Sequence, residues 1–215
     1  MERIVIVGAR GLGRELLSQL RGDAACNRYW IIAGFLDSAG PSILVDGCDV
    51  PVIGSPLTYE PFHMDRFVPA IGDPRAKEEY VAPLLSKGAH FIDIRTNVRL
   101  GDRSTWGVGV VFGLETMISA DCKIGNFVHI DSRANIGHDV TVGDYCHIGS
   151  MVFIAGGVTI GKGVTINPLS SIAAQVTIGD GAVIGMGSVV LRDVPPDTLV
   201  MGNPARIVGS ASKPK

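Results

Sequence analysis

Large apolar residues recur at every sixth position through about half of this chain. From Ile94 to Pro195 the sequence divides into seventeen consecutive blocks of six without insertion or deletion, and each block opens with a large apolar residue. A helix cannot keep that period on one face, because about 3.6 residues per turn rotate each opener away from the previous one. Short parallel strands joined by tight corners can keep it. The pattern therefore predicts stacked three-strand coils around an apolar column.

The first ninety residues follow a different pattern, in which apolar strands alternate with helical spacing. Strands are predicted at residues 2–7, 30–36, 49–53 and 66–71, helices at 14–20 and 74–87, and a glycine-rich turn at 8–13. This order indicates a small Rossmann-like βαβ-type domain. The predicted division is thus this α/β domain at 1–90, the coils at 91–208 and a mobile tail at 209–215.

Composition narrows the classes of partner. The chain has 215 residues, a net charge of −2 and only 6% aromatic residues, which argues against nucleic acid or an anionic membrane as the main partner. No apolar run is long enough to insert into a membrane. The four cysteines show no CxxC spacing and no signal peptide precedes them, so we expect free thiols and a cytoplasmic protein.

Three histidines interrupt the aliphatic pattern at intervals of nine residues: His129, His138 and His147. A purely structural rod accounts for the repeated Ile and Gly but not for these side chains. His138 precedes Asp139, and a carboxylate beside an imidazole stabilises the imidazolium, which suits a general base. His147 is a candidate pocket wall or hydrogen-bond donor, whereas His129 could serve only to stack below it.

The two remaining histidines do not indicate a further site, and the sequence does not favour a metal site. His63 and His90 have no partner that the sequence identifies. The zinc sites of some hexad-repeat proteins use a close HxxxxH pair, which is absent here, so no catalytic metal is expected.

The glycine-rich turn is a candidate anion site. Gly8, Gly11 and Gly13 let backbone approach an anion at the start of a helix, and Arg10 could add a charged contact. The spacing is GxxGxG and not the dinucleotide GxGxxG. Asp37 ends the second strand, where an acid often meets a ribose or base. The alternative is a tight turn followed by an ordinary strand-end Asp.

Together these motifs resemble the bacterial sugar O-/N-acyltransferase family of hexapeptide-repeat proteins. The family includes sialic acid O-acetyltransferases and N-acetyltransferases that act on nucleotide-linked 4-amino-4,6-dideoxy sugars. The resemblance covers nearly the whole chain, and it rests on the hexads and on Gly8–Gly13, Gly34–Asp37, Ala70–Asp73, His138–Asp139 and Gly202–Arg206. It implies a left-handed parallel β-helix after the Rossmann-like domain, and a homotrimer with active sites at the subunit seams.

The resemblance also implies site residues. The catalytic pair would be His138 and Asp139. The acetyl-CoA contacts would be His147, Gly156, Pro168 and Met186. The nucleotide-sugar contacts would be Arg10, Gly11, Leu12, Asp37, Ser38 and Gly72. The family turn often reads Gly-His-Gly where this chain has Gly11-Leu12-Gly13, and Ser38 replaces a second acid, so the sugar and the nucleotide stay open.

The implied activity is acetyl-CoA-dependent N-acetylation of a nucleotide-linked 4-amino-4,6-dideoxy sugar in bacterial surface glycan biosynthesis, without a metal. Two alternatives stay open: O-acetylation of sialic acid or another small hydroxyl acceptor, and a non-catalytic hexapeptide scaffold.

Overall fold

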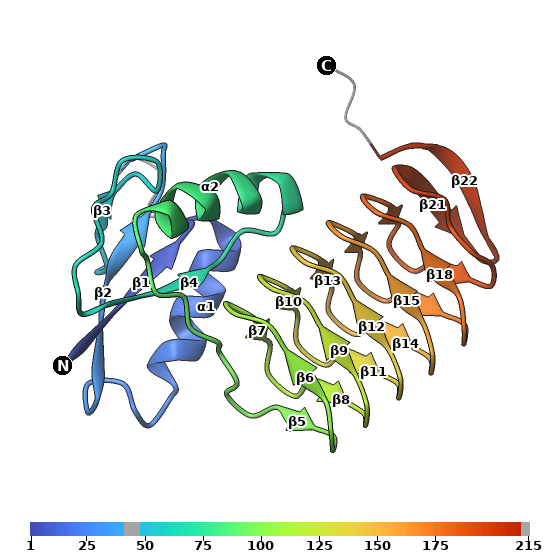
Figure 1. The fold of residues 1–215 in the computed structure, drawn as a ribbon, viewed down its shortest axis with the longest axis horizontal. Helices are drawn as coiled ribbons and strands as arrows, with labels where there is room; N and C mark the ends of the chain where they lie inside the picture. Colours follow the sequence, from blue (N-terminus) through green and yellow to red (C-terminus); the bar gives the residue numbers. More distant parts are fainter. Residues whose placement is uncertain (41–47, 212–215) are drawn as a thin grey trace. The chain divides into compact units, whose positions relative to one another are not determined.

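The computed structural model describes residues 1–40 and 48–211, and the chain separates into two compact units, Met1–Asp93 and Ile94–Lys215. The first unit contains a four-stranded parallel sheet in the order β3-β2-β1-β4, with β1 between its neighbours (Figure 1). Its elements are β1 (Glu2–Val7), α1 (Gly11–Arg21), β2 (Trp30–Leu36), β3 (Val52–Gly54), β4 (Asp65–Pro69) and α2 (Pro74–Ser86).

The sequence of the first unit explains these elements. Ile4 to Val7 are buried in succession, as expected for a central parallel strand that is covered on both faces. The apolar face of α1 packs Leu16, Leu17 and Leu20 into the core. Helix α2 begins where the Asp73 side chain accepts hydrogen bonds from the backbone N–H groups of the first turn. α1 is longer than predicted, since it begins inside the glycine-rich turn.

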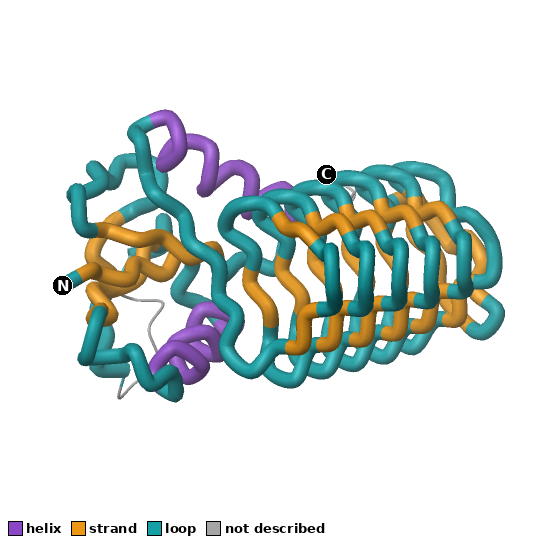
Figure 2. The backbone as a smooth tube through the Cα atoms, turned by 60° about the horizontal axis from the view of Figure 1, so that its bottom comes forward, coloured by secondary structure: helices purple, strands orange, loops and turns teal. Residues whose placement is uncertain are grey.

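The second unit is a parallel β-helix of two-residue strands, which stack in rows along the axis (Figure 2). One row contains β7 (Val111–Phe112), β10 (His129–Ile130), β13 (His147–Ile148), β16 (Thr165–Ile166) and β19 (Val183–Ile184). The second contains β5 (Arg99–Leu100), β8 (Met117–Ile118), β11 (Asn135–Ile136), β14 (Phe153–Ile154), β17 (Ser171–Ile172) and β20 (Val189–Val190). The third contains β6 (Thr105–Trp106), β9 (Lys123–Ile124), β12 (Thr141–Val142), β15 (Thr159–Ile160) and β18 (Thr177–Ile178).

The predicted axial column forms the core of this unit. Each strand pairs with the strand one coil away in exact eighteen-residue register, so that Ile130 lies beside Ile148 and Ile148 beside Ile166. These openers are fully buried, whereas the strand residues before them point away from the axis. These outward strand residues and the corners between strands carry the side chains that are available for chemistry.

The C-terminal end differs from the prediction. β21 (Thr198–Gly202) joins the first row and pairs antiparallel with β22 (Ala205–Ser210). Gly209 and Ser210 therefore belong to a strand, not to the mobile tail expected from residue 209, while residues 212–215 lie outside the described part. Among the described residues, no helix is both long enough and apolar enough to cross a bilayer.

Candidate active site

Three loops of the first unit meet at the carboxyl edge of its sheet. The glycine-rich turn follows β1, Asp37 and Ser38 follow β2, and Gly72 lies between β4 and α2. Parallel strands end at the same edge, and this edge is where α/β sheets bind ligands. The structure thus brings the six predicted substrate residues to one side of this unit.

The turn after β1 leaves its helix terminus open. A Cβ on Gly13 would lie 2.1 Å from the carbonyl oxygen of Gly8, so this close turn requires glycine there. A Cβ on Gly11 would meet no heavy atom within 4 Å. Arg10 is the N-cap of α1 and makes no side-chain capping hydrogen bond. The first N–H groups of α1, including that of Leu12, therefore form a terminus that suits an anion.

The Asp37 side chain is hydrogen-bonded to the backbone of this turn. Its side chain is almost completely buried; Oδ2 accepts a hydrogen bond from the backbone N–H of Ala9 at 3.1 Å, and Oδ1 accepts one from Ala39 at 2.9 Å. The carboxylate thus ties the end of β2 to the turn. Direct contact of Asp37 with a ribose stays a prediction, and any ligand would have to share these oxygens.

Ser38 has a partner that the sequence analysis missed. Its hydroxyl forms a short hydrogen bond with the hydroxyl of Tyr80 on α2. The two residues are 42 positions apart, so only the pairing of strands and helices brings them together. Tyr80 is thereby added to the candidate substrate residues at this edge.

In the second unit, His138 projects from the corner between β11 and β12. Its Nδ1 lies 2.7 Å from Oδ2 of Asp139, and the two side chains are 71% and 64% exposed. Asp139 adopts a left-handed backbone conformation with φ of 59°, which turns its carboxylate back toward the ring. A carboxylate only accepts hydrogen bonds, so it assigns the hydrogen to Nδ1 and leaves the Nε2 lone pair open to solvent.

The two coils before His138 are joined by an ion pair at the same corner. Arg103 donates two hydrogen bonds, of 2.6 and 2.5 Å, to the carboxylate of Asp121. The hydrogen bond from Arg103 holds the pKa of Asp121 below its usual value, with a smaller contribution from His138. Asp121 is one coil from Asp139, so the corner is lined by carboxylates on successive coils.

Gly156 lies directly beside the His138 ring. A Cβ on Gly156 would be 2.6 Å from both Cε1 and Nε2 of His138. The equivalent residue one coil later is Ala174, which has no histidine one coil before it, so alanine fits this position where the preceding coil carries no histidine. Gly156 was predicted only as an acetyl-CoA contact. In the structure, the absence of a side chain at Gly156 leaves room for the His138 ring.

The other predicted acetyl-CoA residues lie at a second corner. His147 is on β13, while Pro168 follows β16 and Met186 lies one coil later in the same column. Met186 is 64% exposed. The predicted acetyl-CoA residues therefore divide between two corners of one chain, with Gly156 beside His138 and the other three along the second corner.

The second corner contains a residue that the sequence analysis missed. Asp131 places its carboxylate between the Nε2 atoms of His129 and His147, at 3.1 and 3.3 Å. Its position two residues after His129 was a usable signal, because the end of a repeat strand opens onto this corner. His129 thus has a partner as well as its stacking contact with His147.

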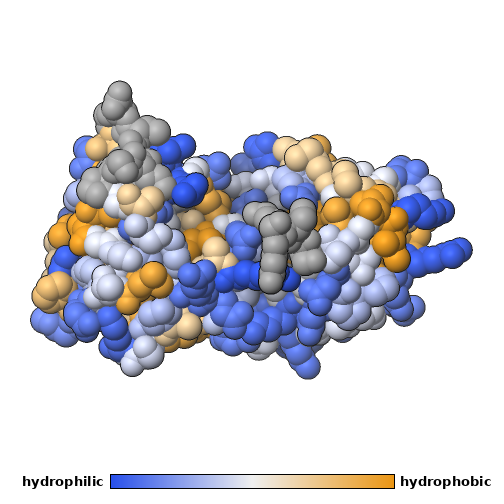
Figure 3. All heavy atoms as spheres, turned by 90° about the horizontal axis from the view of Figure 1, so that it is seen from above, coloured by the Kyte–Doolittle hydropathy of each residue, from blue (hydrophilic) through white to orange (hydrophobic). Residues whose placement is uncertain are grey.

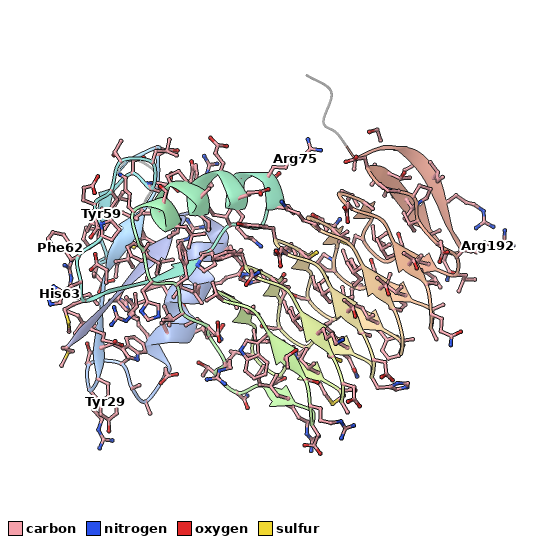
Figure 4. All side chains as sticks on the ribbon, viewed as in Figure 1. Tyr29, Tyr59, Phe62, His63, Arg75 and Arg192 are labelled. Atoms are coloured by element: carbon pink, nitrogen blue, oxygen red, sulfur yellow. The ribbon has the colours of Figure 1, made fainter. Side chains whose placement is uncertain are left out.

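His63 and His90 belong to the first unit, whereas both corners belong to the second. His63 lies beside Phe62 on the outside of the first unit (Figure 4). The carbonyl oxygen of His90 accepts a backbone hydrogen bond from Phe67. Within residues 1–40 and 48–211, no three His, Cys, Asp or Glu side chains are arranged to hold a metal ion.

Comparison with known proteins decides the family. The "PglD N-terminal domain" model matches residues 3–84, and the "bacterial transferase hexapeptide (six repeats)" model matches residues 121–156 and 157–192. A solved variant of perosamine N-acetyltransferase from Caulobacter crescentus, in complex with CoA and GDP-perosamine, is 30% identical over 98% of both chains with a TM-score of 0.86. The chain belongs to the PglD-type family of hexapeptide acetyltransferases.

Two further matches to this PglD-type chain are more limited. The acetyltransferase domain of PglB from Neisseria gonorrhoeae, in complex with acetyl coenzyme A, covers 96% of this chain and 99% of its own at 24% identity, with a TM-score of 0.82, and so shares the fold. Mitochondrial serine acetyltransferase 3 of Arabidopsis thaliana is 62% identical over 32 residues, which are 15% of this chain and 8% of that protein.

Proposed function

We propose that this PglD-type protein transfers the acetyl group of acetyl-CoA to the amino group of a nucleotide-linked 4-amino-4,6-dideoxy sugar, a step in bacterial surface glycan synthesis in the cytoplasm. The observation that carries the proposal is the His138–Asp139 pair, in which the carboxylate occupies Nδ1 and leaves Nε2 free as a base. The full-length likeness to a perosamine N-acetyltransferase supports the same class of acceptor.

The chemistry follows from that geometry. The sugar amine attacks the thioester carbon, so that a C–N bond forms while the C–S bond breaks and CoA leaves as its thiolate. Nε2 of His138 accepts the proton that the nitrogen loses, and Asp139 stabilises the imidazolium that results. Holding both substrates together is enough for direct transfer, so the mechanism needs neither an acyl-enzyme nor a metal.

The two groups of predicted binding residues serve the two substrates. Backbone N–H groups of Gly11 and Leu12 at the open terminus of α1, with the Arg10 guanidinium, would hold the diphosphate. Asp37, Ser38 and Gly72 would shape the rest of that edge. His147, Gly156, Pro168 and Met186 would hold acetyl-CoA.

A homotrimer is part of the proposal. The β-helix exposes large apolar side chains that association would cover, and part of this apolar surface is visible near its C-terminal end (Figure 3). They include Met151, Phe153, Leu169, Met186, Leu191, Met201, Ile207 and Val208. Size-exclusion chromatography with light scattering measures the number of subunits directly.

An O-acetyltransferase is the second candidate, because one short match is to a serine acetyltransferase. Such an enzyme would use the same His138 base on a hydroxyl group and would not need a nucleotide site. A non-catalytic scaffold is the third reading, and it predicts that no acceptor reacts.

The deciding experiment is thiol release from acetyl-CoA with UDP-, GDP- and dTDP-linked 4-amino sugars, sialic acid and serine as acceptors. We expect turnover with one nucleotide amino sugar and a loss of about 10²- to 10⁴-fold in kcat for His138→Ala. His63→Ala, which removes an exposed histidine of the first unit, is the control. Turnover with sialic acid or serine alone would establish O-acetylation, and an unchanged rate in His138→Ala would remove the proposed base.

A further inference from the structure

Three titratable side chains form a mostly enclosed cluster at the corner after β10: His129, Asp131 and His147. β10 pairs with β13 so that the two histidines lie side by side, and their rings stack with centroids 5.4 Å apart and planes 23° apart. Oδ1 of Asp131 lies 3.1 Å from Nε2 of His129, and Oδ2 lies 3.3 Å from Nε2 of His147. One carboxylate therefore contacts the Nε2 atoms of two imidazoles.

The carboxylate decides which ring nitrogens carry hydrogen. Burial alone would raise the pKa of Asp131, but the hydrogen bonds from His129 and His147 outweigh burial and hold this pKa well below its usual range. An ionised carboxylate only accepts hydrogen bonds, so each Nε2 atom that faces it carries a hydrogen. A neutral His147 consequently has its hydrogen on Nε2 and its lone pair on Nδ1.

The lone-pair side of His147 is closed to ligands. Its Nδ1 is buried and has no hydrogen-bond partner among the described residues. A ligand that hydrogen-bonds to the ring must therefore approach the Nε2 side, where it meets a donor. That donor suits the thioester carbonyl oxygen of acetyl-CoA, whereas a ring with its hydrogen on Nδ1 would present a lone pair and repel the oxygen.

We propose that Asp131 is a positioning residue of the acetyl-CoA site, which keeps His147 in the Nε2–H form so that this ring can donate a hydrogen bond to the thioester carbonyl. The inference rests on the proposed function, because it takes His147 as an acetyl-CoA contact. The carbonyl would share the hydrogen with Asp131 in a three-centre hydrogen bond. Asp131 touches no reacting atom in this scheme, and its second oxygen is braced by His129.

The test compares two substitutions of Asp131 in the full-length protein. Asp131→Asn keeps the shape but offers an N–H group that can donate to His147, and Asp131→Ala removes the acceptor in every orientation. Nitrogen NMR of isotope-labelled histidine reports which ring nitrogen carries the hydrogen at a pH where the rings are neutral. We expect His147 to carry it on Nε2 in the wild type and to lose this preference in at least one variant.

Kinetics supply the second readout. The variant that changes the His147 tautomer should raise the KM for acetyl-CoA by about 10- to 100-fold, by analogy with the loss of a carboxylate that orients a metal-bound histidine. The KM for the acceptor should stay unchanged. Asp144→Asn is the matched control, because Asp144 is another corner carboxylate that accepts from the backbone N–H of Asn126 at 2.7 Å and holds no histidine.

The outcomes separate the inference from the proposed function. Retention of the Nε2–H form and of acetyl-CoA affinity in both variants would overturn the inference, even if acetyl transfer is confirmed. If no acceptor reacts, the NMR result together with calorimetric binding of acetyl-CoA still tests it. If neither variant folds, the wild-type spectrum decides, since hydrogen on Nδ1 of a neutral His147 contradicts the proposal.

Discussion

Two corners of the same β-helix pair histidine with aspartate in opposite ways. At the exposed corner, Asp139 accepts a hydrogen bond from Nδ1 of His138, and Nε2 of the same ring faces solvent. At the enclosed corner, the carboxylate of Asp131 lies against the Nε2 atoms of His129 and His147, while Nδ1 of His147 is buried and meets no hydrogen-bond partner in the part of the chain that the structure describes. The first arrangement suits a base that must accept a proton. The second suits a ring that must keep its hydrogen in one place.

The largest expected effect breaks both corners at once, because both depend on the axial column. Ile160 is buried in that column, and Ile160→Asp would place an unpaired charge among aliphatic side chains. Loss of the side chain and burial of the charge together should lower the free energy of unfolding by more than about 5 kcal/mol, comparable to the total stability of many domains.

Thr159→Asp is the control for Ile160→Asp, since Thr159 is the exposed residue of the same strand β15. Chemical denaturation followed by circular dichroism measures both variants. A folded Ile160→Asp protein of wild-type stability would contradict the assignment of the column.

The second prediction breaks only the exposed corner. Gly156→Ala puts a methyl group where the His138 ring now lies, and the ring is free to swing outward because it is exposed. Stability should change little, whereas displacement of the base should lower kcat by about 10- to 100-fold. Steady-state kinetics and thermal unfolding together measure this separation.

Ala174→Gly is the matched control for Gly156→Ala, because Ala174 occupies the equivalent place one coil later. Its kcat should equal that of the wild type. A Gly156→Ala enzyme with full kcat would show that the position of the His138 ring does not limit the reaction.

The two corners also differ in how far the sequence could predict them. The six-residue period predicts the coils because each opener must be buried, and His138 and Asp139 are neighbours in the chain, so their pairing was visible. The bridge from Asp131 to two histidines depends on eighteen-residue stacking and on side-chain rotamers, which no local pattern specifies. Asp131 was therefore missed although both histidines were identified.

The same distinction applies outside the corners. The strands β1 and β2 were predicted at their observed bounds, since β2 and the last four residues of β1 are apolar. The β21–β22 hairpin was missed because it leaves the hexad pattern. Asp37 was predicted from its place at a strand end, but its hydrogen bonds to Ala9 and Ala39 depend on how the turn folds over it.

The smallest expected effect concerns the enclosed corner, where the pH dependence of stability tests the contribution of the ionised Asp131 carboxylate. Asp131 has a pKa below its usual range in the folded protein, because the hydrogen bonds from the two histidines outweigh burial. A carboxyl with a lowered folded pKa contributes stability above its unfolded pKa of about 4, and this contribution is lost as the pH falls through the folded value. Asp131→Asn should therefore lower the free energy of unfolding by about 1–3 kcal/mol at pH 5, the range for hydrogen bonds to a charged group.

The difference in the free energy of unfolding between wild type and Asp131→Asn should then shrink as the pH is lowered below about 4. Urea unfolding from pH 5 to strongly acid conditions measures it, with native circular dichroism at each pH as the control. A constant difference over that range would mean that the Asp131 carboxylate does not depend on its charge to hold the two histidines.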